Sequence, residues 1–261
     1  NEWGGTAVED CADVCNGDAQ MIEYWQDNDG DGLGFESGSE ADFALSFDGE
    51  NDYVRVLDSP DFQSSSNNDY TFQVDMLAES VDCGGSRPYL LGWWNNGNKS
   101  VMLGRYCANT MRFIVDGDGT NIIIDANVTI EADVWYNFTV TKSGNDYKLY
   151  QNGVLVGEVT SDLQYSDVDA NLIIGGCAEV YMENIHHGEM DNLRVWNRSL
   201  SQEEISSNMF QTINYTSSDL VSNFTFNAGS GDILYDHSGN GNDGALIGGP
   251  SWVEKEEGNS S

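Results

Sequence analysis

The sequence predicts an all-β protein, a two-sheet antiparallel sandwich of the jelly-roll type that occupies most of the 261 residues. From residue 42 onward, apolar and polar residues alternate in short runs separated by glycine, asparagine and aspartate, as in half-buried strands joined by turns. The chain has only three prolines, so the predicted strands are rarely interrupted. We expect about 12 to 14 strands, the number that a jelly roll of two packed sheets uses.

The alternation is clearest at residues 135–141. Phe138 and Val140 fall on one face of this strand and Asn137 on the other, because successive side chains of a strand point to opposite faces. If the apolar face fills the core, the Asn137 side chain should reach solvent, and the same alternation directs Asn223 toward solvent.

A hairpin and one short helix are also expected. Asn152-Gly153 lies between two strand-like runs within residues 147–156, and this dipeptide supplies the positive φ angles of a type I′ turn. The helix should run from Ser201 to Met209, where Ser201 can cap the first turn and two glutamates follow near the positive end of the helix dipole.

Residues 1–41 have a different composition and form a predicted spacer with one Cys-x-x-x-Cys unit. Three aspartates alternate before a glycine in this spacer: Asp27, Asp29 and Asp31. Such a pattern can surround one Ca²⁺ with oxygen atoms, and it resembles a thrombospondin type 3 repeat more than an EF-hand, whose last ligand is missing here. A solvated acidic linker would have the same composition.

The charge of the chain limits its partners. With 44 acidic and 10 basic residues, the formal net charge is −34, which disfavours binding to nucleic acid or to an anionic membrane surface. No apolar run approaches the ~20 residues that a membrane helix needs, so we expect no membrane insertion. The acidity fits either an acidic soluble surface or calcium binding by clustered carboxylates.

Sequons and cysteines favour an extracellular protein. Of seven Asn-x-Ser/Thr sequons, six are predicted to carry glycans: Asn98, Asn127, Asn137, Asn197, Asn214 and Asn223. In an oxidising compartment, we expect one disulfide between Cys83 and Cys107, which flank strands of one local meander, and another between Cys11 and Cys15. Cys177 is then unpaired.

Three motifs carry a family resemblance. They are Ala-Leu-Ser-Phe-Asp-Gly-Glu-Asn-Asp-Tyr-Val-Arg-Val at 44–56, Gly-Glu-Met-Asp-Asn-Leu-Arg-Val-Trp-Asn at 188–197 with Leu-Ser-Gln-Glu-Glu-Ile at 200–205, and Asp-His-Ser-Gly-Asn-Gly-Asn-Asp-Gly at 236–244. Together they resemble laminin-G-like domains of the concanavalin-A-like lectin/glucanase superfamily. The resemblance implies a β-sandwich over about residues 42–261, whose usual role is extracellular binding.

The order of the motifs departs from the usual one. Residues 220–231 and the third motif usually open such a domain, whereas here they close it. Either these last strands fold back into the gap in their own sandwich, or they complete a neighbouring copy. The first alternative is favoured, since the termini of compact domains often lie close together.

Calcium sites are expected within the sandwich, because Ca²⁺ takes about six to eight oxygen ligands and acidic turns can supply them. One candidate set combines a turn with a strand that, by resemblance, lies beside it: Asp48, Asn51, Asp52 and Asp191. A second candidate loop holds Asp236, Asn240 and Asn242. The same residue types also make ordinary turns.

An aromatic segment at residues 88–97 indicates a ligand-binding patch, since sugar rings stack on exposed aromatic side chains. Trp93 and Trp94 must point to opposite faces of a strand, so at most one of them belongs to the core. The predicted patch comprises Tyr89, Trp94, Arg105 and Arg112. Ordinary packing is the alternative explanation for each of them.

Catalysis is not expected. Glucanases of this superfamily use a strand that resembles Glu-x-Asp-x-x-Glu, and the chain has Glu189, Asp191 and Arg194 at those positions. Retaining hydrolysis needs two carboxyl groups about 5 Å apart, so a glycosidase would require a second carboxylate from elsewhere in the chain. Adjacent His186 and His187 point to opposite faces and are expected to be loop residues.

The sequence therefore predicts a calcium-stabilised, non-catalytic extracellular module that binds glycans or cell-surface proteins within a larger surface protein. The competing hypothesis is a glycosylated structural subunit that self-associates into a filament or stalk.

Overall fold

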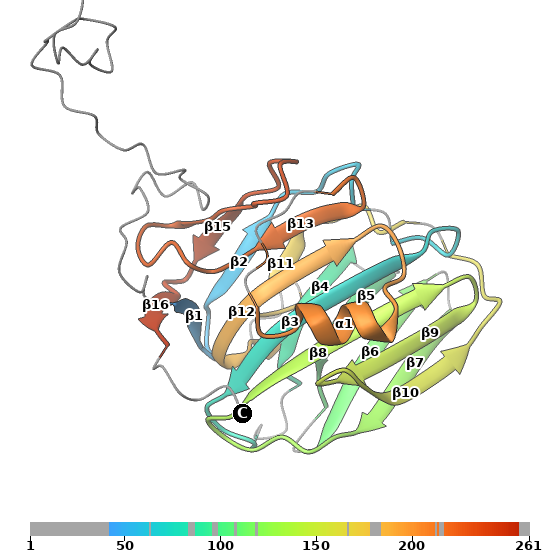
Figure 1. Cartoon of the computed structure of the whole chain (residues 1–261), viewed down its shortest axis with the longest axis horizontal. Helices are drawn as coiled ribbons and strands as arrows, with labels where there is room; N and C mark the ends of the chain where they lie inside the picture. Colours follow the sequence, from blue (N-terminus) through green and yellow to red (C-terminus); the bar gives the residue numbers. More distant parts are fainter. Residues whose placement is uncertain are drawn as a thin grey trace, which may run out of the picture. The chain divides into compact units, whose positions relative to one another are not determined.

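Two antiparallel sheets of eight strands face one another in a computed structural model of the chain (Figure 1). The structure describes residues 42–255, with gaps at 63, 83–86, 96–98, 107–108, 118–119, 166, 178–183, 212 and 214–216. The first sheet has the order β10-β9-β8-β3-β12-β1-β16, and β13 also pairs with β12. Its strands are β10 (Val154–Thr160), β9 (Asp146–Gln151), β8 (Trp135–Ser143), β3 (Tyr70–Ala78), β12 (His187–Trp196), β1 (Phe43–Asp48), β16 (Ser251–Glu254) and β13 (Leu220–Phe224).

The second sheet has the order β14-β15-β2-β11-β4-β5-β6-β7. Its strands are β14 (Ile233–Leu234), β15 (Gly244–Ile247), β2 (Tyr53–Val56), β11 (Leu172–Ile174), β4 (Tyr89–Asn95), β5 (Lys99–Arg105), β6 (Thr110–Gly117) and β7 (Thr120–Asn127). The two-sheet, all-β prediction is confirmed. The described part has sixteen strands, more than expected, because five of them have four residues or fewer and leave too short an alternation to detect in the sequence.

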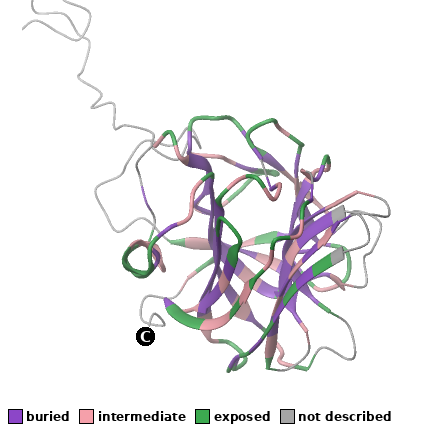
Figure 2. Cartoon of the chain, turned by 90° about the vertical axis from the view of Figure 1, so that its right-hand side faces the viewer, coloured by how far each residue is buried: buried purple, intermediate pink, exposed green. Residues whose placement is uncertain are grey.

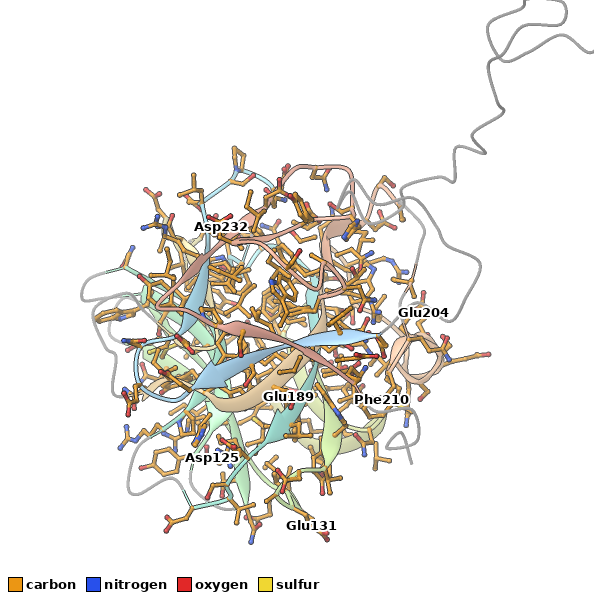
Figure 3. All side chains as sticks on the ribbon, turned by 90° about the vertical axis from the view of Figure 1, so that its left-hand side faces the viewer. Asp125, Glu131, Glu189, Glu204, Phe210 and Asp232 are labelled. Carbon is orange, nitrogen blue, oxygen red and sulfur yellow. The ribbon has the colours of Figure 1, made fainter. Side chains whose placement is uncertain are left out.

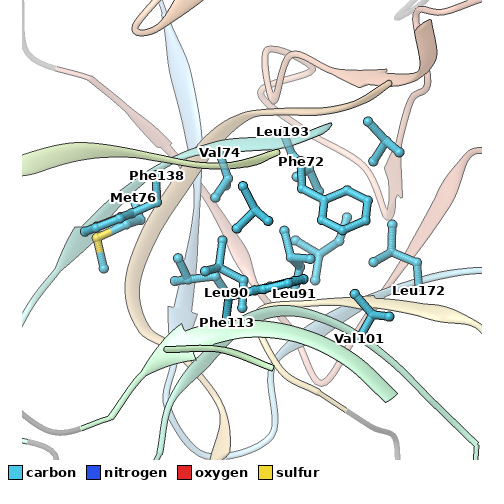
Figure 4. Close-up of a cluster of buried hydrophobic side chains, with 14 of the residues drawn as sticks. Phe72, Val74, Met76, Leu90, Leu91, Val101, Phe113, Phe138, Leu172 and Leu193 are labelled. Atoms are coloured by element: carbon cyan, nitrogen blue, oxygen red, sulfur yellow. The ribbon is translucent and has the colours of Figure 1, made fainter. Parts of the chain in front are cut away.

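The core lies between the two sheets, where the buried residues, coloured purple in Figure 2, gather. The first sheet contributes Phe72, Val74, Met76, Phe138 and Leu193 (Figure 4). The second sheet and its connections contribute Leu90, Leu91, Val101, Phe113 and Leu172. Each of these side chains is at most 2% exposed, and complete burial of one such side chain stabilises a fold by roughly 1.5–3 kcal/mol.

The last strands of the chain join the sandwich of their own chain. β16 pairs with β1, with Phe43 opposite Glu254, and β15 pairs with β2. The backbone N–H of Lys255 donates to the carbonyl oxygen of Asp42 at 2.7 Å. The chain therefore enters and leaves the sandwich side by side, and the alternative in which these strands complete a neighbour is not needed.

The predicted hairpin and helix are both present. Asn152 and Gly153 have φ angles of 48° and 74° between β9 and β10, as a type I′ turn requires. Helix α1 (Gln202–Asn208) has Ser201 at its N-cap, and a capping box joins the side chains and backbones of Ser201 and Glu204.

Helix α1 and the residues after it cover the outer face of the first sheet (Figure 1). We call residues 202–211 the covering segment; Glu204 and Phe210, labelled in Figure 3, belong to it. A small apolar cluster beneath it comprises Tyr150, Trp196, Leu200, Ile205, Ile213 and Leu220. Both faces of the central strands are consequently buried.

This cover overturns two predictions. Asn137 and Asn223 are 0% and 1% exposed, so the expectation that their side chains reach solvent is wrong. The Asn137 side chain instead donates to Asp75 at 2.7 Å beneath the covering segment. A glycan at either asparagine is incompatible with this fold, because neither side chain reaches solvent.

Candidate functional site

A polar cleft of about 560 Å³ opens at one end of the sandwich. Its wall comes from segments that are distant in the sequence and meet in the fold. They contribute Pro60, Asp61, Asn67, Asn68, Asp69, Asn197, Ser218, Leu220, Val221 and Asn240. The lining thus combines two carboxylates, four carboxamides and one hydroxyl with a small apolar area, and this volume suits a ligand of small-molecule size.

Buried groups fix the loop that forms one wall of the cleft. The ammonium group of Lys142, 1% exposed, donates to the carbonyl oxygens of Ser66, Asn68 and Gly144 at 2.8–2.9 Å. Asp69 accepts a hydrogen bond from the Gly144 backbone at 2.7 Å. This wall is therefore held in place before any ligand arrives, which lowers the entropy lost on binding.

The opposite wall is tied to β13. The Asn240 side chain donates to the carbonyl oxygens of Leu220 and Val221, each at 3.0 Å. The backbone N–H of Asn197 donates to the carbonyl oxygen of Asp219 at 2.9 Å. These contacts place the Asn240 loop against the end of β12 and the start of β13.

A much smaller cavity of about 10 Å³ lies beside the cleft and shares Asp61, Asn197 and Val221 with it. Trp93 also lines this cavity, and its indole N–H has no hydrogen-bond partner among the described residues. The side chain is only 2% exposed. Buried donors are normally satisfied, so this N–H marks a place for one acceptor atom.

The predicted aromatic patch lies elsewhere, on the outer face of the second sheet. Cross-strand pairing aligns Gly92, Met102, Ile114 and Ile123 in one row across β4 to β7. Trp94 belongs to the next row and is half-buried, whereas Trp93 is in the core, so the two tryptophans face opposite sides as expected.

The Arg112 side chain near this face already has partners within the chain. Arg112 makes two hydrogen bonds of 2.6 and 2.7 Å to Asp125, and its guanidinium group lies 3.9 Å from the ring centre of Tyr106. The Asp125 pairing raises the pKa of Arg112.

Two members of the predicted patch are buried in the fold. Arg105 is 2% exposed and donates to the carbonyl oxygen of Ser80, and Tyr89 is 9% exposed beside Gly104. Their assignment to a recognition surface is therefore wrong, whereas Trp94 and Arg112 keep partial exposure.

The first candidate calcium set is not brought together. Asp48 faces His187 across the β1–β12 pair, and Asp191 lies four residues farther along β12, about 13 Å away at strand spacing. One oxygen of Asp48 accepts from the backbone N–H groups of Glu50 and Asn51, at 2.8 and 3.1 Å. Asp52, in turn, accepts from the Asp48 backbone at 3.1 Å.

Asp191 is paired with a lysine. Its carboxylate accepts from the Lys255 ammonium group at 2.7 Å and from the Asn192 side chain at 2.9 Å. Burial raises the pKa of Asp191 to about 7, against the opposing effect of Lys255. The positive charge near this carboxylate is supplied by the protein itself.

Hydrogen bonds within the loop and to β13 hold the second candidate loop in place. Asp236 accepts from the backbone N–H groups of Asn223, Ser238 and Asn242, at 2.9–3.0 Å. The Asn242 side chain donates to the Val221 carbonyl at 3.0 Å. Carboxylate oxygens directed at N–H groups are poorly placed to ligate a cation.

Among the described residues, no group of three or more acidic, histidine or cysteine side chains is arranged to hold a metal, and calcium binding within the sandwich stays a prediction. The other predicted ligands, Asp27, Asp29 and Asp31, lie outside the described residues.

The remaining predicted glycosylation sites and cysteines lie partly inside and partly outside the described residues. Asn127 and Asn197 are exposed, whereas Asn98 and Asn214 lie outside the described residues. Cys177 is a buried free thiol. The cysteines of both predicted disulfides fall outside the described residues: Cys11, Cys15, Cys83 and Cys107.

The strand with the glucanase-like pattern is sealed. Burial raises the pKa of Asp75 to about 6, and its carboxylate and that of Asp191 both accept from Asn192 beneath the covering segment. Arg194, 0% exposed, donates to the carbonyl oxygens of Asn208 and Gln211. These groups hold the cover in place, and a substrate has no access to them.

A family model described as the concanavalin A-like lectin/glucanases superfamily, of laminin G type, matches residues 48–206. The chain belongs to this family. No curated protein sequence matches the chain. Within the described residues, no helix has the length and apolarity that crossing a membrane requires.

Solved structures share this fold at low sequence identity. A Bacteroides ovatus protein, to which carbohydrate binding is ascribed, aligns with a TM-score of 0.66 and 16% identity over 86% of this chain and 66% of its own. The CBM40 of a Ruminococcus gnavus sialidase, solved with α2,3-sialyllactose, aligns with a TM-score of 0.53 and 15% identity over 63% of this chain and 95% of its own. Domain 4 of an extracellular arabinanase from Geobacillus stearothermophilus, solved with arabinotriose, aligns with a TM-score of 0.51 and 16% identity over 63% of this chain and 75% of its own.

Sequence patterns point to only two residues of the cleft, Asn197 as a sequon and Asn240 as a candidate calcium ligand. Local clustering in Asn67-Asn68-Asp69 was a usable signal, because three polar residues directly precede the buried Tyr70.

Proposed function

We propose that this protein is a non-catalytic, extracellular glycan-binding module and that the polar cleft is its binding site. The observation that carries the proposal is the lining of the cleft, in which carboxylates, carboxamides and a hydroxyl surround a small apolar area. A sugar presents the complementary surface, since its hydroxyl groups both donate and accept hydrogen bonds while its C–H groups contact apolar side chains.

The rigidity of the cleft supports the same function. Sugars exchange many hydrogen bonds with water for hydrogen bonds with protein, so the net gain per bond is only about 0.5–1.5 kcal/mol. Affinity then depends on polar groups that are already in position. The contacts of Lys142 and Asn240 provide such positioning for both walls.

The relatives add weight to this assignment. The three structures reported above are a protein to which carbohydrate binding is ascribed, a sialidase module solved with sialyllactose and an arabinanase domain solved with arabinotriose. In the last two, the module shares a fold with this chain and is a part of a larger enzyme.

Binding to a glycan array tests the proposal. We expect at least one glycan to bind the purified chain, and Asp61→Asn combined with Asp69→Asn to weaken that binding by about tenfold or more, as the loss of about 1.4 kcal/mol implies. Asn can still accept the hydrogen bond that Gly144 gives to Asp69, so the wall should remain folded.

The control variant Glu131→Gln removes one exposed carboxylate far from the cleft. Glu131 lies near the Ala78 end of β3, whereas Asp69 precedes Tyr70 at the other end, and the two ends of this strand are roughly 27 Å apart. This variant should bind like the wild type. If no glycan binds, or if the cleft variant binds as tightly as the control, the cleft is not a glycan site.

Calcium binding is proposed for the N-terminal segment alone, on the alternating pattern of Asp27, Asp29 and Asp31. Titration calorimetry with Ca²⁺ should give a binding signal that disappears in a variant with Asn at all three positions. If the triple variant binds Ca²⁺ as the wild type does, the ions bind elsewhere.

A second candidate function is a structural repeat in a filament or stalk. It is favoured by the adjacent entry and exit of the chain at Asp42 and Lys255, which suits a module strung along a longer chain. Sedimentation of the purified chain over a range of concentrations tests self-association. A monomer at every concentration would argue against a filament formed by this part of the protein.

A further inference from the structure

The cleft and the small cavity beside it carry information on which sugars can bind. Of the described residues that line the cleft, none is lysine, arginine or histidine, while Asp61 and Asp69 contribute two carboxylates. The Lys142 ammonium group behind one wall uses its three N–H groups on backbone carbonyls. It offsets part of the negative charge but has no donor left for a ligand.

Arg198, a described cation near the cleft, is also engaged. Arg198 follows the lining residue Asn197 and pairs with Glu204 at 2.8 Å and with Asp219 at 3.4 Å. The chain as a whole carries a formal net charge of −34, so its long-range field is negative. A carboxylate, sulfate or phosphate on a ligand would therefore meet repulsion from Asp61 and Asp69, and the described lining residues offer no basic side chain to compensate.

The small cavity requires a group that both accepts and donates. The unpartnered indole N–H of Trp93 needs an acceptor. Asp61, which lines the same cavity, is an exposed carboxylate that accepts a hydrogen bond from the Ser59 hydroxyl through Oδ2 at 3.2 Å, and its other oxygen can accept from a further donor. At about 10 Å³ the space admits a single oxygen atom or one water molecule. A hydroxyl group meets both requirements, whereas a deprotonated acidic group cannot donate to Asp61.

We propose that the cleft selects neutral, hydroxyl-rich sugars, that one sugar hydroxyl enters the small cavity between Trp93 and Asp61, and that acidic sugars are excluded. This inference rests on the proposed function, since it specifies the ligand class of the same site. It separates this chain from the sialidase module of similar fold, which was solved with an acidic sugar.

The test compares neutral glycans with their sialylated, sulfated or uronic counterparts on one array. Each neutral glycan is compared with an acidic counterpart that differs only by a charged group on one sugar unit. We expect the neutral glycan to bind at least about tenfold more tightly, because one unscreened contact between like charges weakens binding by about that factor. The double variant Asp61→Asn, Asp69→Asn should bring the ratio of neutral to acidic affinity closer to one, and Glu131→Gln should leave this ratio unchanged.

Two readouts separate charge from shape. Raising the salt concentration from 0.05 to 0.5 M should narrow the ratio in the wild type, because screening weakens the repulsion. In nitrogen–proton NMR spectra, the Trp93 indole signal, assigned by its loss in Trp93→Phe, should shift when a neutral glycan binds. If Trp93→Phe does not fold, sequential assignment of the wild-type spectrum identifies the same signal, and the shift itself is measured on the wild type.

The failures are distinguishable. If no glycan binds, the proposed function fails. If glycans bind through the cleft and acidic ones bind as tightly as neutral ones, the function stands and the selectivity is refuted. An unchanged Trp93 indole signal in the glycan complex would refute the placement of a hydroxyl in the small cavity.

Discussion

Replacement of Arg194 by methionine should release the covering segment from the first sheet. The Arg194 guanidinium group is 0% exposed and donates to the carbonyl oxygens of Asn208 and Gln211 and to the side chains of Asn192 and Asn223. Methionine fills similar space but offers no donor. Each buried acceptor left without a donor costs about 1–3 kcal/mol, and loss of one partner from a buried charge pair costs about 3–5 kcal/mol.

The expected loss is about 4 kcal/mol of the free energy of unfolding, because the buried carboxylate of Asp75 also loses a nearby positive charge. Urea unfolding at neutral pH measures this value. Amide hydrogen exchange should also accelerate at Phe210, whose N–H donates to Asp75 at 3.2 Å. Because typical domains are stable by only about 5–15 kcal/mol, the variant should remain folded but be far weaker.

Two further variants make the result decisive. Arg198→Met removes an exposed pair with Glu204, both side chains being about 40% exposed, and should cost less than about 1 kcal/mol. Arg194→Lys keeps the positive charge but loses the planar guanidinium group, so its loss of unfolding free energy should lie between those of Arg198→Met and Arg194→Met. This variant gives a measurable free energy of unfolding if Arg194→Met does not fold. A cost below about 1 kcal/mol for Arg194→Met would refute the role of this arginine.

Two other predictions concern pH and glycosylation. Burial, aided by Arg105, lowers the pKa of His186 to about 3 in the fold, against about 6.5 when unfolded, so its contribution to stability is present above pH 6.5 and is lost as pH falls toward 3. Relative to His186→Gln, the wild type should therefore lose about 2 kcal/mol between pH 7.5 and 5 in urea unfolding, and a constant difference would contradict the burial argument. In mass spectrometry of native material, a glycan should occur at the exposed sequon Asn127, whereas modification of a major fraction at Asn137 or Asn223 would contradict the fold, and modification at Asn197 would block the cleft.

Local rules predicted the elements of this fold well. The Asn152-Gly153 turn and the cap at Ser201 follow from backbone preferences of a few residues, which need no knowledge of the rest of the chain. The alternation of residues 135–141 likewise gives the correct inward face, with Phe138 in the core. These signals depend on neighbours within one turn or one strand.

Contacts between distant segments were not predictable in this way. Asn137 appeared to face solvent because the cover over it comes from residues more than 60 positions later in the chain. The cleft unites residues 60–69 with 197, 218–221 and 240, and each piece alone is an ordinary polar turn. Asp48 and Asp191 were correctly placed on neighbouring strands, but their separation depends on the register, which the sequence did not specify.

The side-by-side exit of the chain has a mechanical consequence. A pull on both ends acts across the Phe43–Glu254 pair, at the point where β1 starts and β16 finishes. Such a load breaks the hydrogen bonds of this pair one after another, rather than all at once as in shear. Peeling that continues backward through β16 and β15 then reaches Asn240, a residue of the cleft wall. Tension along the chain would therefore disturb the cleft, and a ligand bound there as proposed would be released once this peeling passes β15.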